Sequence, residues 1–296
     1  MNLYINEFKF SLESKKKMAV NSVSAYIRDV NEFELFLENK NVNDLKGASQ
    51  ADITDYLLML KHEGKSAATV NRKMASLRAF YRYLSEKNII EDNPAVDIKV
   101  PKISRREIEY LTIEEVEELL KQPDDSIKGL RDRAILEVLY ATGLRVSELI
   151  ETNVEDVNLR MGFVTCTGEY GKARIIPLGR PAKAALETYI YDDRAKIIKD
   201  GDTSETALFL NYYGKRLTRQ AMWKILREYA KKAEIDKKIT PQILRNSFAV
   251  HMVQNGADLK SLQELLGHED PAATQIYLSV TKNRIKDVYD STHPRA

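Results

Sequence analysis

The stretch that decides the fold is Thr240-Pro-Gln-Ile-Leu-Arg-Asn-Ser-Phe-Ala-Val-His251, near the end of the chain. Two further segments follow it, Leu265-Leu-Gly-His268 and Thr274-Gln-Ile-Tyr277. Each segment carries one side chain that suits a phosphodiester: a guanidinium, an imidazole or a phenol, from Arg245, His268 and Tyr277. Their fixed order predicts that the three side chains converge on one phosphate group.

A second arginine in a similar setting lies far upstream, in Thr142-Gly-Leu-Arg145-Val-Ser-Glu148. Taken alone, an arginine after Gly-Leu is usually a helix-end residue paired with an acid, and Glu148 follows three positions later. A single tyrosine is usually a packing residue, and this chain has 15 of them. The ordered set of four segments is what favours a catalytic interpretation over these ordinary ones.

The four segments together resemble the tyrosine recombinases, the phage integrase family, and the run to the final His293-Pro-Arg-Ala296 is most similar to the Xer branch. The resemblance covers nearly the whole chain. It implies a site-specific DNA recombinase that cuts and rejoins DNA through a 3′-phosphotyrosine intermediate. It assigns Tyr277 as the nucleophile and Arg145 and Arg245 as the phosphate ligands. His268 would bind the phosphate or position the nucleophile.

Two positions depart from the family pattern. Gln242 stands where the family usually has a histidine, and glutamine cannot transfer a proton at neutral pH. The family's lysine, the acid for the leaving oxygen, aligns with Glu169 in the turn Gly168-Glu-Tyr-Gly171. A carboxylate about 5 Å from a phosphate would cost roughly 3 kcal/mol at an effective dielectric of about 20. Either Glu169 points to solvent, or Lys172 reaches the leaving group instead, and we favour Lys172 as the substitute acid.

These departures leave alternatives to an active enzyme. The chain could be a DNA-binding relative that has lost cleavage and acts architecturally or with a partner recombinase. An unrelated helical protein-interaction module would bind DNA weakly and with little dependence on salt. Covalent attachment of Tyr277 to DNA distinguishes the first interpretation from both others.

Charge placement says more than total charge. The chain has 46 Lys and Arg against 44 Asp and Glu, a net charge of +2 in 296 residues. Two stretches, 64–85 and 211–227, each carry five cations and no acid, a pattern that fits local binding to phosphates and fits solvated helix faces equally well. The predicted DNA-binding residues from these stretches and the linker are Lys65, Arg72, Lys73, Arg78, Lys102, Arg105, Lys215, Arg216 and Arg219.

The sequence predicts two domains and a mainly helical fold with a small β-hairpin or sheet. Apolar spacing predicts helices at 20–38, 50–63 and 66–85, in an N-terminal core-binding domain (residues 1–98) that the resemblance identifies as SAM-like. Residues 99–108 form a basic linker after the stop signal Asn93-Pro94. Residues 109–296 would be an α+β catalytic domain.

The predicted catalytic domain begins with a capping-box pattern, Thr112 and Glu115. An apolar helix is expected at 129–141 and a β-hairpin between 157 and 179. Further helices are expected at 180–196, 218–233, 241–254, 258–266 and 271–290. The last of these, with Ile285, Val288 and Tyr289, could dock into a neighbouring protomer or pack within its own chain.

A single cysteine, Cys166, excludes an intramolecular disulfide and a cysteine-rich metal site, and fits a reducing cytoplasm. The first residues lack a signal-peptide pattern, and no stretch reaches the ~18 apolar residues of a membrane span. The resemblance implies double-stranded DNA as the partner, with four protomers on two duplexes, either all of this chain or together with a second recombinase. It implies neither metal nor nucleotide cofactor. The DNA site and the biological use, chromosome or plasmid dimer resolution or element integration and excision, cannot be read from the chain.

Overall fold

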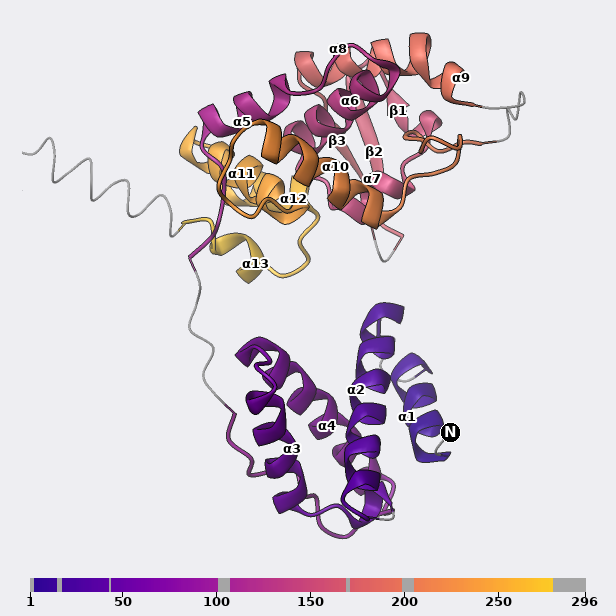
Figure 1. The fold of residues 1–296 in the computed structure, drawn as a ribbon, viewed down its shortest axis with the longest axis vertical. Helices are drawn as coiled ribbons and strands as arrows, with labels where there is room; N and C mark the ends of the chain where they lie inside the picture. The colour runs from indigo at the N-terminus through magenta and orange to yellow at the C-terminus, as the bar shows by residue number, and fades with distance from the viewer. Residues whose placement is uncertain are drawn as a thin grey trace, which may run out of the picture. The chain divides into compact units, whose positions relative to one another are not determined.

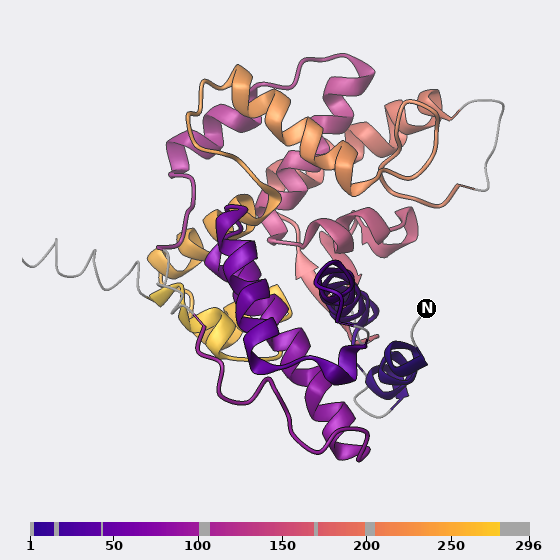
Figure 2. The ribbon, with the colours of Figure 1, turned by 60° about the horizontal axis from the view of Figure 1, so that its bottom comes forward.

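The chain divides into two compact units, residues 1–106 and 107–296, which Figure 1 and Figure 2 show as ribbons. The structure, a computed structural model, describes residues 3–14, 18–42, 44–100, 107–168, 171–198 and 205–278. Each unit has its own cluster of buried apolar side chains. Each can therefore be described by itself.

The first unit is a small helical bundle in which α2 contacts α1, α3 and α4. Its described elements are α1 (Leu3–Ser14), α2 (Val20–Asn39), the 3-10 turn η1 (Leu45–Gly47), α3 (Gln50–His62) and α4 (Ala67–Glu86). The helices predicted at 20–38, 50–63 and 66–85 correspond to α2, α3 and α4. Helix α1 was not predicted, although its buried Ile5, Phe8 and Leu12 follow helical spacing.

Two serines set the starts of helices in this unit. Ser49 and Asp52 form a capping box at the start of α3, because each side chain bonds the backbone N–H of the other residue. Ser66 caps α4 by accepting from the N–H of Thr69. These local bonds satisfy N–H groups that have no partner inside the helix. Gly64, between α3 and α4, adopts the left-handed φ of +73°.

A buried carboxylate joins α2 to α4. The side chain of Asp29 is fully buried and accepts from Ser76 Oγ at 2.8 Å and from Lys73 Nζ at 3.4 Å. Arg72 Nη1 also donates to Asp29, and Lys73 Nζ to Glu32. Because a buried carboxylate without a partner is costly, these donors are required for the packing of the two helices.

The same contacts correct part of the DNA-binding prediction. Lys73 is only 4% exposed at its side chain and is held by two acids, so it is a core ion pair and is not available to a phosphate. Arg78 donates to the backbone carbonyl of Ile98, and Arg72 is partly exposed but paired with Asp29. The sequence pattern missed the two ion pairs because the acid that neutralises Arg72 and Lys73, Asp29, lies about forty residues upstream.

The second unit packs helices around a three-stranded antiparallel sheet of order β1-β2-β3. Its described elements up to the sheet are α5 (Ile113–Lys121), α6 (Ile127–Thr142), α7 (Val146–Glu151), η2 (Val154–Asp156), β1 (Val157–Asn158), β2 (Phe163–Thr167) and β3 (Ala173–Pro177). After the sheet come α8 (Arg180–Thr188), η3 (Tyr189–Asp193), α9 (Arg194–Ile197), α10 (Arg219–Lys232), α11 (Pro241–Gln254), α12 (Leu259–Leu266) and α13 (Ala272–Gln275).

The predicted mainly helical fold with a small sheet is confirmed. β2 and β3 form the expected hairpin, with Val164 opposite Ile176 and Cys166 opposite Arg174. Helix α6 contacts both α8 and α11, which places the stretch 240–251 against the apolar helix at 127–142. The expected capping box of Thr112 and Glu115 starts α5.

Two predicted helices differ from the structure. The helix expected at 180–196 is divided by the π-helical turn η3, where Tyr189 is buried and its hydroxyl accepts from the N–H of Leu210. The helix expected at 271–290 starts with only the four residues of α13, and Tyr277 lies in the turn that follows. The remainder of that prediction, with Ile285, Val288 and Tyr289, falls outside the described residues.

None of the described helices is both long and apolar enough to cross a membrane. In the described parts of the chain, His, Cys, Asp and Glu side chains form no group of three that could hold a metal ion. Cys166 is a buried free thiol, and burial raises its pKa to about 11, so it is not a reactive nucleophile at neutral pH.

Candidate active site

Arg145 is positioned by a sharp turn between two helices. α6 ends at Gly143, which adopts the left-handed φ of +60°. A Cβ at this position would lie 2.4 Å from Phe248 Cδ1 of α11, so glycine is required for both backbone and packing. Arg145 then becomes the N-cap of α7, with its side chain 42% exposed.

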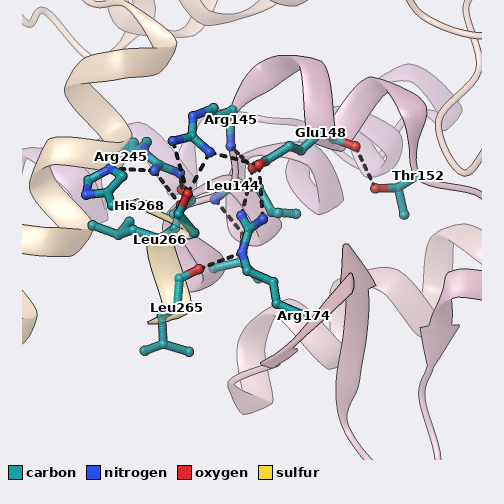
Figure 3. A network of polar contacts seen from close by, with 12 residues as sticks. Leu144, Arg145, Glu148, Thr152, Arg174, Arg245, Leu265, Leu266 and His268 are labelled. Carbon is teal, nitrogen blue, oxygen red and sulfur yellow. Dashed lines mark hydrogen bonds and ion pairs between the residues drawn. The ribbon is translucent and has the colours of Figure 1, made fainter. Parts of the chain in front are cut away.

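Glu148 is the buried carboxylate that fixes two arginines. It accepts from the backbone N–H of Arg145 at 2.8 Å and from Arg145 Nη1 at 3.0 Å. Arg174, on β3, donates to both oxygens of the same carboxylate at 3.0 and 2.8 Å. Burial alone would raise the pKa of Glu148, but the bonds from Arg174 and from the Arg145 backbone outweigh it and lower that pKa. Glu148 is therefore ionised and holds both guanidinium groups in place (Figure 3).

The C-terminal end of α12 gathers the guanidinium groups of three arginines. Arg174 Nε donates to the carbonyl of Leu265 at 2.9 Å, and Arg245 Nη2 to that of Leu266 at 2.7 Å. Arg145 donates to the carbonyls of Leu266 and Gly267, both at 3.4 Å. The last carbonyls of a helix lack intrahelical partners and carry partial negative charge, so they attract cations. Figure 3 shows Arg145, Arg174 and Arg245 turned toward this helix end.

Arg245 is almost completely buried, with 3% of its surface exposed. Its Nη1 donates to the carbonyl of Gly143 at 2.6 Å, so the residue joins α11 to the end of α6 as well as to α12. Burial, and then the neighbouring Arg145, lower its pKa to about 10, which still leaves it charged at neutral pH. Three guanidinium groups against the one carboxylate of Glu148 leave an excess of two positive charges in this cluster.

His268 follows Gly267 directly, in a backbone position fixed by a reciprocal pair of bonds with Gln263. Arg245 Nη2 donates to His268 Nε2 at 2.9 Å, and His268 Nδ1 lies 2.8 Å from Thr274 Oγ1. Because arginine has only donors, Nε2 must accept and the ring proton must lie on Nδ1. Burial, followed by Arg245 and Arg145, lowers the pKa of His268 to about 4. The ring is therefore neutral at pH 7.

Tyr277 packs its ring into the apolar cluster that contains Phe248 and Leu262, and only 1% of the residue is exposed. Its hydroxyl donates to Asn246 Oδ1 at 3.2 Å, in a contact that is only partly buried. Burial raises the pKa of Tyr277, while Arg245 and Arg145 act in the opposite direction. The phenol is therefore protonated at neutral pH and lies within the field of both arginines.

Lys172 lies on the hairpin at the edge of a cleft of about 970 Å³ that Arg145, Arg174 and His268 also line. Its side chain is 84% exposed, with Nζ 3.8 Å from Glu269 Oε1. Gly171, at φ +74, and the bond from Gly168 N–H to the Lys172 carbonyl, 2.9 Å, shape the described part of the turn. Glu169, the predicted departure from the family pattern, lies outside the described residues.

Gln242 lies on the first turn of α11, on the exposed side, and its amide Nε2 donates to Asn246 Oδ1 at 2.9 Å. The structure thus brings Arg145, Arg245, His268 and Tyr277 together, with Lys172 at the rim of the same cleft. Gln242 joins them through Asn246.

The remaining predicted DNA-binding cations have different settings. Arg216 donates to the carbonyl of Ile150 at 2.7 Å and to Asn153 Oδ1 at 2.6 Å, so it is a structural residue and that prediction is corrected. Lys65, Lys215 and Arg219 are exposed, and Lys65 lies 3.6 Å from Glu63. Lys102 and Arg105 fall outside the described residues.

Three residues of this cluster were not singled out from the sequence: Arg174, Asn246 and Thr274. A signal existed only for Arg174. It stands two positions before the buried Ile176 on β3 and therefore shares the inward face of the strand, where an arginine requires a partner. Asn246 contacts Tyr277, 31 residues away, and Thr274 contacts His268, six residues away. No local sequence pattern marks either residue.

The second unit thus gathers three arginines around an ionised glutamate, with a neutral histidine and a buried tyrosine beside them. Residues 109–284 match the phage integrase family, and residues 5–88 match the N-terminal SAM-like domain of phage integrases. The chain belongs to the phage integrase family, the tyrosine-type site-specific recombinases.

Curated relatives match over the full length. The chain is 44% identical to tyrosine recombinase XerD of Oceanobacillus iheyensis over 293 residues, 99% of this chain and 98% of the relative. It is 43% identical to tyrosine recombinase XerD of Listeria monocytogenes serotype 4b, covering 100% of both chains. The predicted similarity to the Xer branch is confirmed.

Solved structures share the fold. The XerH recombinase bound to a palindromic difH substrate, in a post-cleavage complex, has a TM-score of 0.75 and 21% identity, with 96% of this chain and 83% of that chain covered. A lambda integrase dimer bound to a COC′ core site has a TM-score of 0.73 and 19% identity, with 93% of each chain covered.

Proposed function

We propose that this chain cuts and rejoins double-stranded DNA through a covalent link between Tyr277 and a 3′-phosphate. The observation that carries the proposal is the end of α12, where Arg145, Arg174 and Arg245 meet beside His268 and the buried Tyr277. These residues come from β3, α11, the turns before α7 and after α12, and the turn after α13. An excess of two positive charges suits a phosphodiester and its developing charge in the transition state.

In the proposed reaction the oxygen of Tyr277 attacks the phosphorus, and the bond from phosphorus to the 5′-oxygen breaks. The phenol loses its proton to water as it attacks, because Arg145 and Arg245 stabilise the phenolate. Lys172 gives a proton to the departing 5′-oxygen and regains one from solvent. The phosphotyrosine conserves the energy of the phosphodiester, so that a second strand can displace it without a metal or a nucleotide.

The proposed DNA contacts use cations that are exposed on the surface of the described structure. Lys65 in the first unit and Arg219, Lys224 and Arg227 along α10 in the second are exposed. Trp223 lies on the same helix, with the guanidinium of Arg227 5.7 Å from its ring centre. Such cations position a protein on the phosphate backbone and make binding depend on salt. Lys102, Arg105 and Lys215 remain predicted contacts. We further propose four protomers on two duplexes, of one chain or with a second recombinase.

Covalent trapping on DNA tests this function. A nicked suicide duplex, carrying a site selected from random DNA by binding to the protein, is incubated with wild type and with Tyr277→Phe. We expect a slowly migrating, protease-sensitive adduct with wild type and none with the phenylalanine variant. Lys172→Ala is expected to form the adduct about 10²–10⁴ times more slowly, because it lacks the acid. Lys121→Ala, an exposed lysine on α5 outside the cleft, is the matched control and is expected to match wild type.

Other outcomes of this experiment point to the alternatives. Tight, salt-dependent binding without an adduct would identify a relative that works by binding alone. Glu169→Lys combined with Gln242→His should then restore the adduct. Weak binding that hardly changes with salt would instead indicate a protein-interaction module.

A further inference from the structure

The side chain of Asn246 is the one direct link that the described residues provide between Gln242 and Tyr277. Asn246 Oδ1 accepts two hydrogen bonds, from Tyr277 Oη at 3.2 Å and from Gln242 Nε2 at 2.9 Å. Its Nδ2 donates to the backbone carbonyl of Glu109 at 2.9 Å. This last bond settles which end of the amide is the oxygen, because a carbonyl can only accept.

The position of Asn246 suits an orienting role. It follows the buried Arg245 on α11, so its backbone is fixed by a residue that is itself tied to α6 and α12. The ring of Tyr277 is held by the apolar cluster, which leaves the direction of its hydroxyl hydrogen as the main freedom. A hydrogen directed at Asn246 leaves the lone pairs of the phenol oxygen free to face a phosphorus atom.

We propose that Asn246 is a positioning residue for the nucleophile and that Gln242 acts through Asn246, without contacting the phosphate. The inference rests on the proposed function and deepens it. Gln242 occupies the position where the family usually has a histidine, and its amide donates to the oxygen that receives the tyrosine hydroxyl. Neither amide can take a proton at neutral pH, so the pair orients the phenol and does not ionise it.

A double-mutant cycle separates this role from direct phosphate binding by Gln242. Single-turnover adduct formation and DNA affinity are measured for wild type, Gln242→Ala, Asn246→Ala and the double variant. We expect Asn246→Ala to slow adduct formation about tenfold, the size of one lost hydrogen bond, with unchanged DNA affinity. The double variant should be no slower than Asn246→Ala alone, because Gln242 has lost the group through which it acts.

Multiplicative losses in the double variant, or a weaker DNA affinity for Gln242→Ala, would mean that Gln242 contacts the phosphate itself and would overturn the proposal. Adduct formation at the wild-type rate by Asn246→Ala would overturn it as well.

Two controls address stability. Asn255→Ala removes an exposed asparagine at the opposite end of α11 and should leave the rate unchanged. Asn246→Leu removes the same hydrogen bonds and keeps the same number and branching of side-chain heavy atoms, and it replaces the alanine variant in the cycle if that protein melts near the assay temperature.

A spectroscopic measurement on the free protein keeps this inference separate from the proposed function. In protein labelled with ¹³C at the tyrosine ζ carbon, the signal that disappears in Tyr277→Phe belongs to Tyr277. We expect this signal to shift in Asn246→Ala, because the carbon bears the hydroxyl whose hydrogen bond is lost. An unchanged signal would exclude the contact. If wild type forms no adduct but the signal shifts, the proposed function fails while the contact stands.

Discussion

At the scale of single residues, the site combines groups that are charged and groups that are kept neutral. Glu148 is ionised because two arginines surround it, and Arg245 remains charged although it is buried. His268 is kept neutral first by its burial and then because Arg245 and Arg145 repel its protonated form. The cluster therefore keeps its excess positive charge on the guanidinium groups, which do not lose protons at neutral pH.

The neutral state of His268 predicts a pH dependence of stability. Its pKa of about 4 in the folded protein lies below the ordinary value of about 6.5 expected in the unfolded chain. Between these values the unfolded state binds more protons, so the free energy of unfolding falls as the pH drops from about 6.5 toward 4. Its contribution is fully present above about pH 6.5.

Urea unfolding of wild type and His268→Gln across this range measures the effect. We expect the urea midpoint of wild type to fall more steeply with decreasing pH than that of His268→Gln. On unfolding, wild type should take up nearly one proton more than the variant. His251, whose pKa burial also lowers, is present in both proteins and cancels in the comparison. Equal slopes for the two proteins would show that the pKa of His268 is not lowered.

At the scale of elements, the junction between α12 and His268 depends on a glycine. Gly267 ends α12 at φ +63, a left-handed conformation that other residues adopt at a cost of about 1 kcal/mol. A Cβ there would lie 2.8 Å from Arg174 Nη1 and 2.9 Å from its Cζ. The guanidinium of Arg174 would have to move, and its two hydrogen bonds to Glu148 would be disturbed.

Gly267→Ala is therefore expected to lower both stability and adduct formation. The matched control is Gly256→Ala, which also has positive φ, +92, but whose Cβ would meet nothing within 4 Å. Both variants should lose about 1 kcal/mol or more of unfolding free energy. Only Gly267→Ala should slow adduct formation, by about tenfold or more, because it alone displaces Arg174. Equal rates of adduct formation for the two variants would show that the position of Arg174 beside Glu148 does not matter for the reaction.

At the scale of the whole molecule, the chain consists of two units with separate cores. We propose that residues 107–296 carry the chemistry and that the first unit adds phosphate contacts, among them Lys65. The isolated segment 107–296 is expected to melt cooperatively, because its core and its sheet lie entirely within it.

The DNA affinity of this segment should be weaker than that of the full chain and should fall less steeply with salt. In the full chain, each phosphate contact that the first unit supplies makes the plot of log affinity against log salt concentration steeper by about 0.9. The isolated segment lacks these contacts, so its slope should be shallower by that amount for each one. Affinity measured at several salt concentrations for both proteins checks this. An unchanged slope would mean that the first unit makes no phosphate contact, and a broad melting transition would contradict two independent cores.

Local signals in the sequence determined most of the elements and singled out four candidate site residues. The capping pair Thr112 and Glu115, the stop at Asn93-Pro94 and the spacing of apolar residues act over a few positions, so they can be read directly. The order of Arg145, Arg245, His268 and Tyr277 likewise indicated the family, because that order is a property of the chain itself.

Only the tertiary structure decided which partners these residues have. Lys73 was predicted to contact DNA and instead neutralises the buried Asp29, 44 residues away. Arg174 lies in the predicted hairpin, and the structure shows that it shares Glu148 with Arg145. Asn246 connects Gln242 to Tyr277, 31 residues away. The physical reason is the same in each case. The free energy of a buried charge or hydroxyl depends on the donors and acceptors that folding brings beside it, and local sequence patterns do not encode them.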